Sequence, residues 1–153
     1  MRTIKFRGKK VTNGVWAYGS LVYLDENGAA IYVQTDNGSE KVMELVYVDP
    51  DTVCQFTGFL DKNGNEIYEG DVLRSDTYPC SNIGDNQIDN YYEIIGWNNE
   101  EAAFYAVPAK NPKSSVRGTF DGLADSISQY MMKDFEVIGN VHDEDWKQYR
   151  EYV

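Results

Sequence analysis

The sequence has little of the chemistry on which most metal and catalytic sites depend. It contains one histidine, His142, and two cysteines, Cys54 and Cys80, in 153 residues. A single histidine cannot build a histidine-rich zinc site, and the two cysteines do not form the Cys-x-x-Cys pair of zinc ribbons and redox motifs. We therefore expect two reduced, structural thiols, no zinc, and no triad built on a cysteine or serine with a histidine.

Signature motifs and long apolar runs are also missing. The sequence has no G-x-x-x-x-G-K-[ST], G-x-G-x-x-G or G-x-S-x-G, which are the signatures of nucleotide-binding and hydrolase sites, and we expect no cofactor. No stretch approaches the 18 consecutive apolar residues of a membrane-spanning helix. The charged start, MRTIKFRGKK, lacks the apolar stretch of a signal peptide, so we expect a cytoplasmic protein with no membrane partner.

Basic residues are scarce and unevenly placed. The chain has 14 lysines and arginines against 25 acidic residues, which gives a net charge of −11. Residues 1–24 carry five of the basic residues and no acid, whereas the other 129 residues have a net charge of −16. Such a chain repels phosphate backbones, so direct binding of nucleic acid is disfavoured. The basic start either meets an acidic surface, its own or a neighbour's, or supplies the solvated lysines that protect a strand edge.

What the sequence does have indicates a β-rich fold with a real core. Aromatic residues make up 14% of the chain, and Asn-Gly, which favours tight hairpin turns, occurs four times. Between these turns lie runs rich in tyrosine, valine and isoleucine, which suit a pleated sheet. The predicted strands are 3–9, 15–24, 29–35, 41–48, 52–58, 71–76, 91–97, 102–108 and 135–141.

Two short helices and a long loop complete the predicted pattern. The apolar residues of segment 119–132 fall on one helical face, and the tail 142–152 starts acidic and ends basic, as a helix dipole favours. Residues 76–90 form a long polar loop without a pattern of its own. The short strands from 71 to 141, with their sharp turns, would suit a small half-open barrel. The fold class that we expect is mainly β.

The segment 57–73, TGFLDKNGNEIYEGDVL, is the strongest candidate for chemistry. Its D-x-N-x-N start imitates a calcium loop, but an EF-hand requires glycine at the sixth position and an acid at the twelfth. This chain has Glu66 and Val72 there, and the flanks read as strands. A hairpin that turns at Asn63-Gly64, followed by a bend at Glu69-Gly70-Asp71, is the simpler interpretation.

The polar residues of this segment are the candidate site. Acidic pairs that hold Mg²⁺ would make it a hydrolase, but strand alternation scatters these carboxylates over different faces. We therefore predict no catalytic residues and regard the segment as an exposed surface for a partner. The candidate partner contacts are Asp61, Asn63, Glu66, Glu69 and Asp71. The aromatic residues Tyr91, Tyr92, Trp97, Phe104 and Tyr105 could stack nucleobases, but without interleaved basic residues we expect them to pack in the core.

The same segment, preceded by Phe56, resembles the hallmark segment of the YopX family, small proteins encoded mostly by bacteriophages and prophages. The resemblance extends over nearly the whole chain. It includes the start MRTIKFR, the paired strands IIGWNNEEAAFYAV at 94–107 and the closing FEVIGNVH at 135–142. The chain departs from the family pattern mainly at 76–90, where its loop is long.

The resemblance implies one domain over 1–153, with an N-terminal β-hairpin region at 1–56 and an SH3-like half-open barrel at 57–153. It also implies phage origin and self-association, but no reaction, because the family has no established biochemical function and offers no catalytic residues. If the protein self-associates, we expect the basic N-terminal strands to take part.

Three classes of function are therefore weighed. The leading hypothesis is a non-enzymatic phage or prophage accessory protein that acts by binding another protein. The alternative is an acidic DNA mimic that inhibits a host DNA-processing protein, and a metal-dependent hydrolase is the third.

Overall fold

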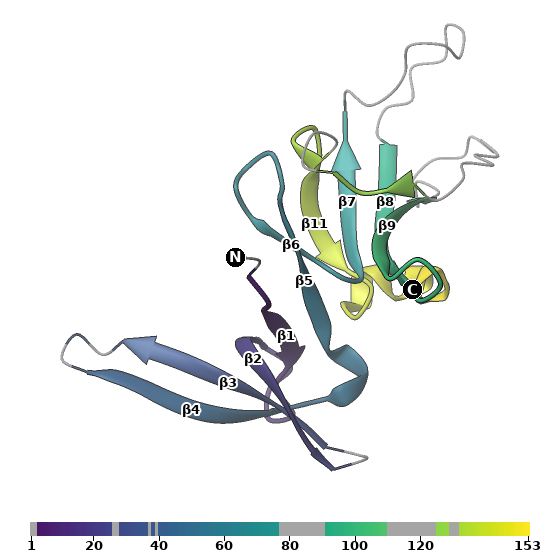
Figure 1. Ribbon diagram of the computed structural model, residues 1–153. Helices are drawn as coiled ribbons and strands as arrows, with labels where there is room; N and C mark the ends of the chain where they lie inside the picture. Colours follow the sequence, from purple (N-terminus) through teal and green to yellow (C-terminus); the bar gives the residue numbers. More distant parts are fainter. Residues whose placement is uncertain are drawn as a thin grey trace, which may run out of the picture. The chain divides into compact units, whose positions relative to one another are not determined.

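The computed structural model describes residues 3–25, 28–36, 38, 40–76, 91–109, 125–128 and 132–153. Most of them lie in strands, which form two antiparallel sheets (Figure 1). The expected mainly β class is confirmed. The described strands do not form a closed barrel, and the SH3-like detail stays a prediction.

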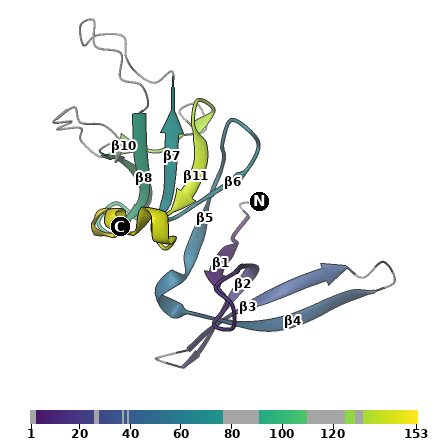
Figure 2. The same ribbon diagram turned by 180° about the vertical axis from the view of Figure 1, so that it is seen from behind.

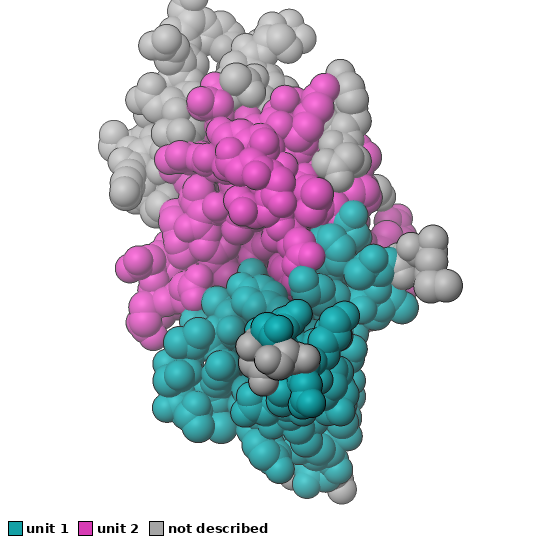
Figure 3. All heavy atoms as spheres, turned by 90° about the vertical axis from the view of Figure 1, so that its left-hand side faces the viewer, with its two compact units in different colours: residues 1–58 teal, residues 59–153 magenta. Residues whose placement is uncertain are grey.

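The chain divides into two compact units, which Figure 3 colours separately. Unit 1 comprises Met1–Gly58 and unit 2 comprises Phe59–Val153. Each has its own apolar cluster, so each is described by itself.

Unit 1 is an antiparallel sheet built largely from consecutive hairpins. Its strands are β1 (Phe6–Lys9), β2 (Trp16–Asp25), β3 (Gly28–Asp36), β4 (Lys41–Val48) and β5 (Cys54–Leu60), whose last two residues belong to unit 2. They lie in the order β4-β3-β2-β1-β5, followed by β6 (Glu66–Tyr68). A short 3-10 helix, η1 (Pro50–Thr52), leads into β5, and the Asp49 side chain accepts a hydrogen bond from the Asp51 N–H at its start.

The apolar cluster of unit 1 lies on one face of its sheet. The strand register places Ala17, Ala29, Ile31 and Val48 on the same face, where they form the buried cluster of this unit. Residues directly opposite each other across antiparallel strands point to the same side of the sheet. The other face therefore carries the alternate residues, including several tyrosines.

Unit 2 contains the second sheet, with the strand order β10-β9-β8-β7-β11. Its strands are β7 (Asp71–Ser75), β8 (Tyr91–Asn98), β9 (Ala103–Ala109), β10 (Asp125–Ser126) and β11 (Glu136–Asn140). Every pairing is antiparallel, and β11 has an irregularity between Val137 and Gly139 where its register against β7 shifts. A 3-10 helix, η2 (Glu144–Tyr152), follows β11 (Figure 2).

The core of unit 2 is built from both faces of this sheet. One cluster is assembled around Leu73, Ile95 and Phe135, and the other around Val72, Ile94 and Val141. Of the five aromatic residues predicted to pack in the core, Tyr91, Tyr92 and Phe104 are buried, whereas Trp97 and Tyr105 are half-buried. The helix η2 contributes Tyr149 and Trp146 to the second cluster.

The prediction of a helix over 119–132 is wrong at Asp125–Ser126. These residues form the short strand β10, which pairs with β9, and the buried Ile127 follows it into the core of unit 2. Packing against a sheet edge has overridden the helical spacing of the apolar residues. The tail helix exists as η2, although it is of the 3-10 type, and β6 is the second strand of the hairpin predicted at Asn63-Gly64.

Two predicted features stay outside the described residues. They are nearly all of the predicted loop at 76–90, where only residue 76 is described, and most of segment 119–132. Among the helices that are described, none combines the length and apolar character needed to cross a bilayer.

Candidate functional site

The Asp61 carboxylate organises the turn that the sequence singled out. Its Oδ1 accepts hydrogen bonds from the backbone N–H groups of Asn63 and Asn65, both at 2.8 Å. The turn is closed by the Asp61 N–H, which donates to the Asn65 carbonyl at 2.8 Å. Gly64 adopts a φ of +83°, a conformation that glycine reaches without strain. The Asn63-Gly64 turn is therefore confirmed.

The second oxygen of Asp61 links this turn to β11. Asp61 Oδ2 accepts hydrogen bonds from the Val137 N–H and the Asn65 side-chain amide, both at 3.0 Å. The Lys62 N–H donates to the Phe135 carbonyl at 2.8 Å, which adds a second link. Burial of Asp61 raises the pKa of its carboxyl, but the hydrogen bonds from Val137, Asn65 and Asn63 outweigh it and leave the pKa lowered.

Four N–H donors around Asp61 make an environment suited to a negative charge. A cation would need the carboxylate lone pairs that these donors already occupy. Within the described ranges, no three His, Cys, Asp or Glu side chains come close enough together to hold a metal ion. The observed role of Asp61 is to fold the turn and fix it to the neighbouring strand.

Asp71 is a second buried carboxylate with a structural role. Its Oδ2 accepts a hydrogen bond from the Tyr68 N–H at 2.8 Å, and its Oδ1 accepts one from the Asn140 amide at 3.0 Å. Between them, Gly70 has a φ of +74° and donates its N–H to the Ile95 carbonyl at 2.7 Å. The Val141 N–H donates to the Gly70 carbonyl at 2.9 Å. The bend is thus held by strands from elsewhere in unit 2.

Asn140 is the residue at this bend that the sequence did not reveal. Its amide donates to the Glu69 carbonyl at 3.0 Å as well as to Asp71, and its Oδ1 accepts from the His142 N–H at 3.0 Å. The side chain is buried and satisfied on both its donor and its acceptor atoms. An asparagine just after Gly139 at the end of a predicted strand is the only sequence signal for it, and that signal is weak.

The five candidate contacts therefore differ in exposure. The expectation that all are exposed is wrong for Asp61 and Asp71, because both side chains serve as internal hydrogen-bond acceptors and are buried. Asn63 is exposed, and Glu66 and Glu69 are half-buried. The carboxylate of Glu66 accepts a hydrogen bond from the Tyr68 hydroxyl at 2.6 Å. Whether any of the five contacts a partner stays a prediction.

Close to the turn, Glu136 joins two basic side chains. Its Oε1 accepts hydrogen bonds from the Arg74 guanidinium, with Nε at 2.7 Å, and its Oε2 lies 3.4 Å from the Lys62 ammonium. The hydrogen bond from Arg74 is the main reason that the pKa of Glu136 is lowered. Since both basic groups are partly exposed, this cluster contributes little to stability, about 1 kcal/mol or less.

Unit 1 presents a different kind of surface, which the sequence analysis did not identify. Cross-strand pairing puts Tyr32 opposite Ser20 and Leu45, and Tyr47 opposite Ala30, so these side chains share the face of the sheet that lacks the core cluster. Tyr18 belongs to the same face by strand alternation. We call Tyr18, Tyr32, Leu45 and Tyr47 the aromatic face. Each of these side chains is exposed, from 38% for Leu45 to 57% for Tyr47.

Basic residues of β1 lie on the same side of the sheet. Arg7 pairs with Tyr18 in the register, and its guanidinium lies 4.4 Å from the ring centre of Trp16. The Lys9 ammonium lies 5.2 Å from the same ring, and Lys5 lies 5.9 Å from the ring of Tyr18. These are cation–π distances, so Arg7 and Lys9 pack on Trp16 and Lys5 packs on Tyr18 of the aromatic face.

A signal for this surface was present in the sequence. Along β4, the run Val42, Met43, Leu45, Val46, Tyr47 and Val48 is apolar at both odd and even positions. A strand that is covered on one face alternates between apolar and polar residues, so apolar residues on both faces indicate that both faces are covered. Only the even-numbered face meets the core of unit 1, because Val46 and Val48 belong to its cluster.

Comparisons with known proteins agree with the described fold. The crystal structure of protein EF1440 from Enterococcus faecalis is similar, with a TM-score of 0.54 and 17% sequence identity over 95% of this chain and 97% of that chain. At this identity the likeness shows the fold alone. A search of curated proteins finds no match. The family model described as YopX protein matches residues 5–145. From the first strand to the start of the last helix, then, the chain is a member of the YopX family.

Proposed function

We propose that this YopX-family protein is a non-enzymatic phage or prophage accessory protein that acts by binding another protein through the aromatic face. The observation that supports it is the exposure of Tyr18, Tyr32, Leu45 and Tyr47 together on one side of the unit 1 sheet. Single exposed apolar residues are ordinary, whereas a contiguous group marks an interaction surface. Tyrosine in particular suits binding, because it offers apolar area and a hydroxyl together.

The chemistry of the partner follows from the charges beside the aromatic face. Lys5 and Lys9 lie over aromatic rings on this side of the sheet, in the segment of the chain that has no acidic residue. A protein surface with apolar side chains surrounded by carboxylates would complement them. We also propose that residues 57–153 form an SH3-like half-open barrel, on which this contact does not depend.

The test uses the full chain as bait in extracts of the infected or lysogenic host. The variant Tyr32→Ser/Tyr47→Ser removes two rings of the aromatic face, and Tyr23→Ser is the matched control. Tyr23 is exposed on the same sheet but pairs with Ala29 and so points to the opposite face. We expect a partner that the unaltered chain and the control capture and the double variant loses. Equal capture by all three proteins would contradict the proposal.

A second function, an acidic DNA mimic, is favoured by the charge of unit 2. That unit holds eighteen acidic and eight basic residues, so most of the negative charge of the chain lies there. Binding to a DNA-processing enzyme that weakens steeply as salt is added would support this alternative. Binding that does not respond to salt would count against it.

A further inference from the structure

Part of unit 1 consists of two strands beside which the described residues place no third. The pairing of β2 with β3 ends at Tyr32, whereas β3 and β4 stay paired as far as Asp36 and Lys41. Residues 33–36 and 41–44 therefore form a two-stranded ribbon, which we call the arm. Figures 1 and 2 show it continuing past the point where β2 crosses β3.

The composition of the arm does not fit a ribbon surrounded by water. Val42 and Met43 point to opposite faces of β4, and both are more than 40% exposed. A two-stranded ribbon without a covered face is marginally stable in water. A strand added beside the arm would give it the third member that it lacks.

One edge of the arm has the geometry to accept such a strand. At the C-terminal end of β4, the Val11 N–H donates to the Tyr47 carbonyl at 3.2 Å, and the Asp49 N–H donates to the Lys9 carbonyl at 2.8 Å. The backbone groups of odd-numbered residues thus face away from β3. By alternation those of Met43 and Leu45 do the same. In the strand order, β4 is the terminal strand, and no strand of the described chain lies beside these two residues.

We propose that the arm pairs antiparallel, along its β4 edge, with the arm of a second copy of this chain. A two-fold axis at Met43 places Met43 opposite Met43 and Lys41 opposite Leu45, with Glu44 opposite Val42. In this register the two sheets form one continuous sheet, with corresponding faces of the two copies on the same side. The outward-facing N–H and C=O groups of the odd-numbered residues then hydrogen-bond across the axis. It sets no two like charges opposite each other.

Charge singles out this edge as the place where two copies of the chain can meet. The chain has a net charge of −11, so two copies repel over most of their surface. The strand β4 is an exception, since Lys41 and Glu44 cancel and its other residues are uncharged. Prolines and lysines usually protect a strand edge, but β4 has no proline and a single lysine. This contact lies in β4, not in the basic first strand that the sequence suggested.

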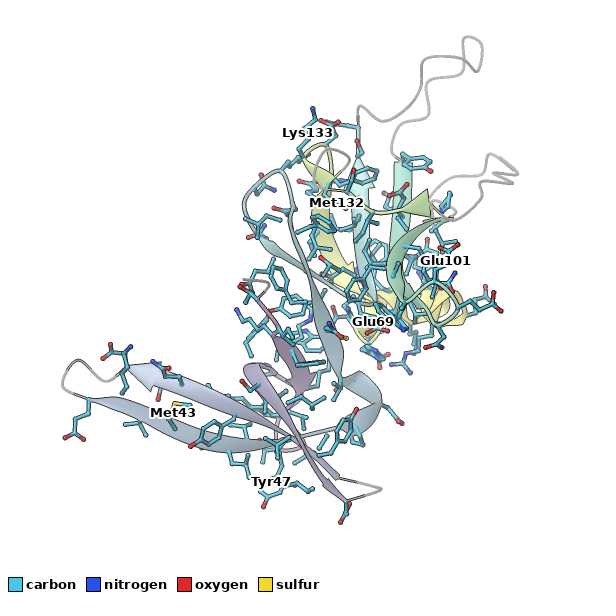
Figure 4. All side chains as sticks on the ribbon, in the orientation of Figure 1. Met43, Tyr47, Glu69, Glu101, Met132 and Lys133 are labelled. Atoms are coloured by element: carbon cyan, nitrogen blue, oxygen red, sulfur yellow. The ribbon has the colours of Figure 1, made fainter. Side chains whose placement is uncertain are left out.

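The experiment replaces Met43 with either sign of charge in the full chain. Met43 is labelled in Figure 4, and its side chain is 45% exposed, so Met43→Lys and Met43→Glu should both fold. Mass is measured by light scattering after gel filtration, and folding by circular dichroism. We expect a dimer for the unaltered chain and a dissociation constant raised at least about tenfold for each variant alone, because each pair sets like charges opposite each other.

Mixing the two variants tests the register directly. Equal amounts of Met43→Lys and Met43→Glu should recover a mixed dimer, because opposite charges then face each other across the axis. The control is Gln34→Lys, which adds a charge on the same face of the arm but on β3, where Gln34 pairs with Met43. We expect this variant to stay dimeric.

A monomer at every concentration of the unaltered chain would overturn the inference. So would dimers that survive both single variants, or a mixture that stays monomeric. Pairing of β4 with a strand of another protein instead of a second copy would overturn it too. The inference depends on the arm and not on the aromatic face. Capture of a partner by a monomeric Met43→Lys chain would therefore support the proposed function whatever the mass measurements show.

Discussion

Unit 1 and unit 2 differ in where they place their apolar side chains. Of the thirteen large apolar side chains that are exposed in the described part of the chain, eleven belong to unit 1 and two to unit 2. The two units also differ in net charge. Unit 1 has six basic and seven acidic residues, whereas unit 2 has eight basic and eighteen acidic residues. Unit 2 is an acidic unit with a buried core on both faces of its sheet. Unit 1 is nearly neutral, and in its described residues one face and one edge of the sheet carry exposed apolar side chains.

This difference separates two roles for polar and apolar residues. In unit 2 the carboxylates that looked functional, Asp61 and Asp71, are buried and hold turns in place. In unit 1 the tyrosines that looked like ordinary strand residues are exposed together. A buried, fully hydrogen-bonded acid serves the fold, whereas an exposed apolar group has to be explained by something that covers it.

The largest effect that we predict lies at the Gly70 bend of unit 2. A Cβ at Gly70 would lie 3.0 Å from the Asn140 amide nitrogen and 3.1 Å from a Val141 methyl, with φ at +74°. We expect Gly70→Ala to lower the free energy of unfolding by about 2–3 kcal/mol.

The matched control for this substitution is Gly64→Ala. Gly64 has a similar φ of +83°, but a Cβ there would meet nothing within 4 Å. The expected cost is about 1 kcal/mol, from the backbone alone. Urea unfolding of both variants measures the difference. Equal losses would show that the contacts of Gly70 with Asn140 and Val141 do not constrain the bend.

A smaller effect, which depends on pH, is predicted for Asp61→Asn. An asparagine amide would face the donors of Val137 and Asn65 in place of an acceptor oxygen, so we expect a loss of about 2 kcal/mol at neutral pH. The pKa of Asp61 is lowered from its ordinary value of 3.8 in the folded chain. Its charge therefore stabilises the fold fully above that value, and this contribution is lost as the pH falls through the lower folded pKa.

The measurement is the difference in unfolding free energy between the variant and the unaltered chain as a function of pH. It should be largest near neutral pH and should narrow below about pH 4. A difference that does not change with pH would mean that the charge of Asp61 does not contribute, and that only the shape of its side chain matters.

The smallest effect on stability is predicted on the aromatic face of unit 1. Tyr47 is 57% exposed, so Tyr47→Ser should change the free energy of unfolding by about 0.5 kcal/mol or less. The matched contrast is Tyr149→Ser in unit 2, where the ring is buried against Trp146 and the loss should be several-fold larger. A large loss at Tyr47 would show that its ring already packs within the chain, and the contrast between the units would then be wrong.

The family, the β class and most strands could be predicted, because they depend on local signals. Asn-Gly turns and strands rich in tyrosine and valine indicate hairpins without reference to distant parts of the chain. The error at Asp125–Ser126 arose because the spacing of Leu123, Ile127 and Tyr130 fits a helix, while pairing with β9 decides the outcome. The exposure of Asp61 was misjudged for a similar reason. Its partner Val137 is 76 residues away, and no local pattern encodes that contact.

By itself, the sequence determined that the chain is a β-rich member of the YopX family with tight turns at Asn13-Gly14 and Asn63-Gly64. These properties depend on the conformations that neighbouring residues along the chain can adopt. Tertiary structure alone decided which carboxylates are buried and which tyrosines are exposed. Burial depends on which distant strands come together, and that depends on pairing across the sheet and not on the order of residues along one strand.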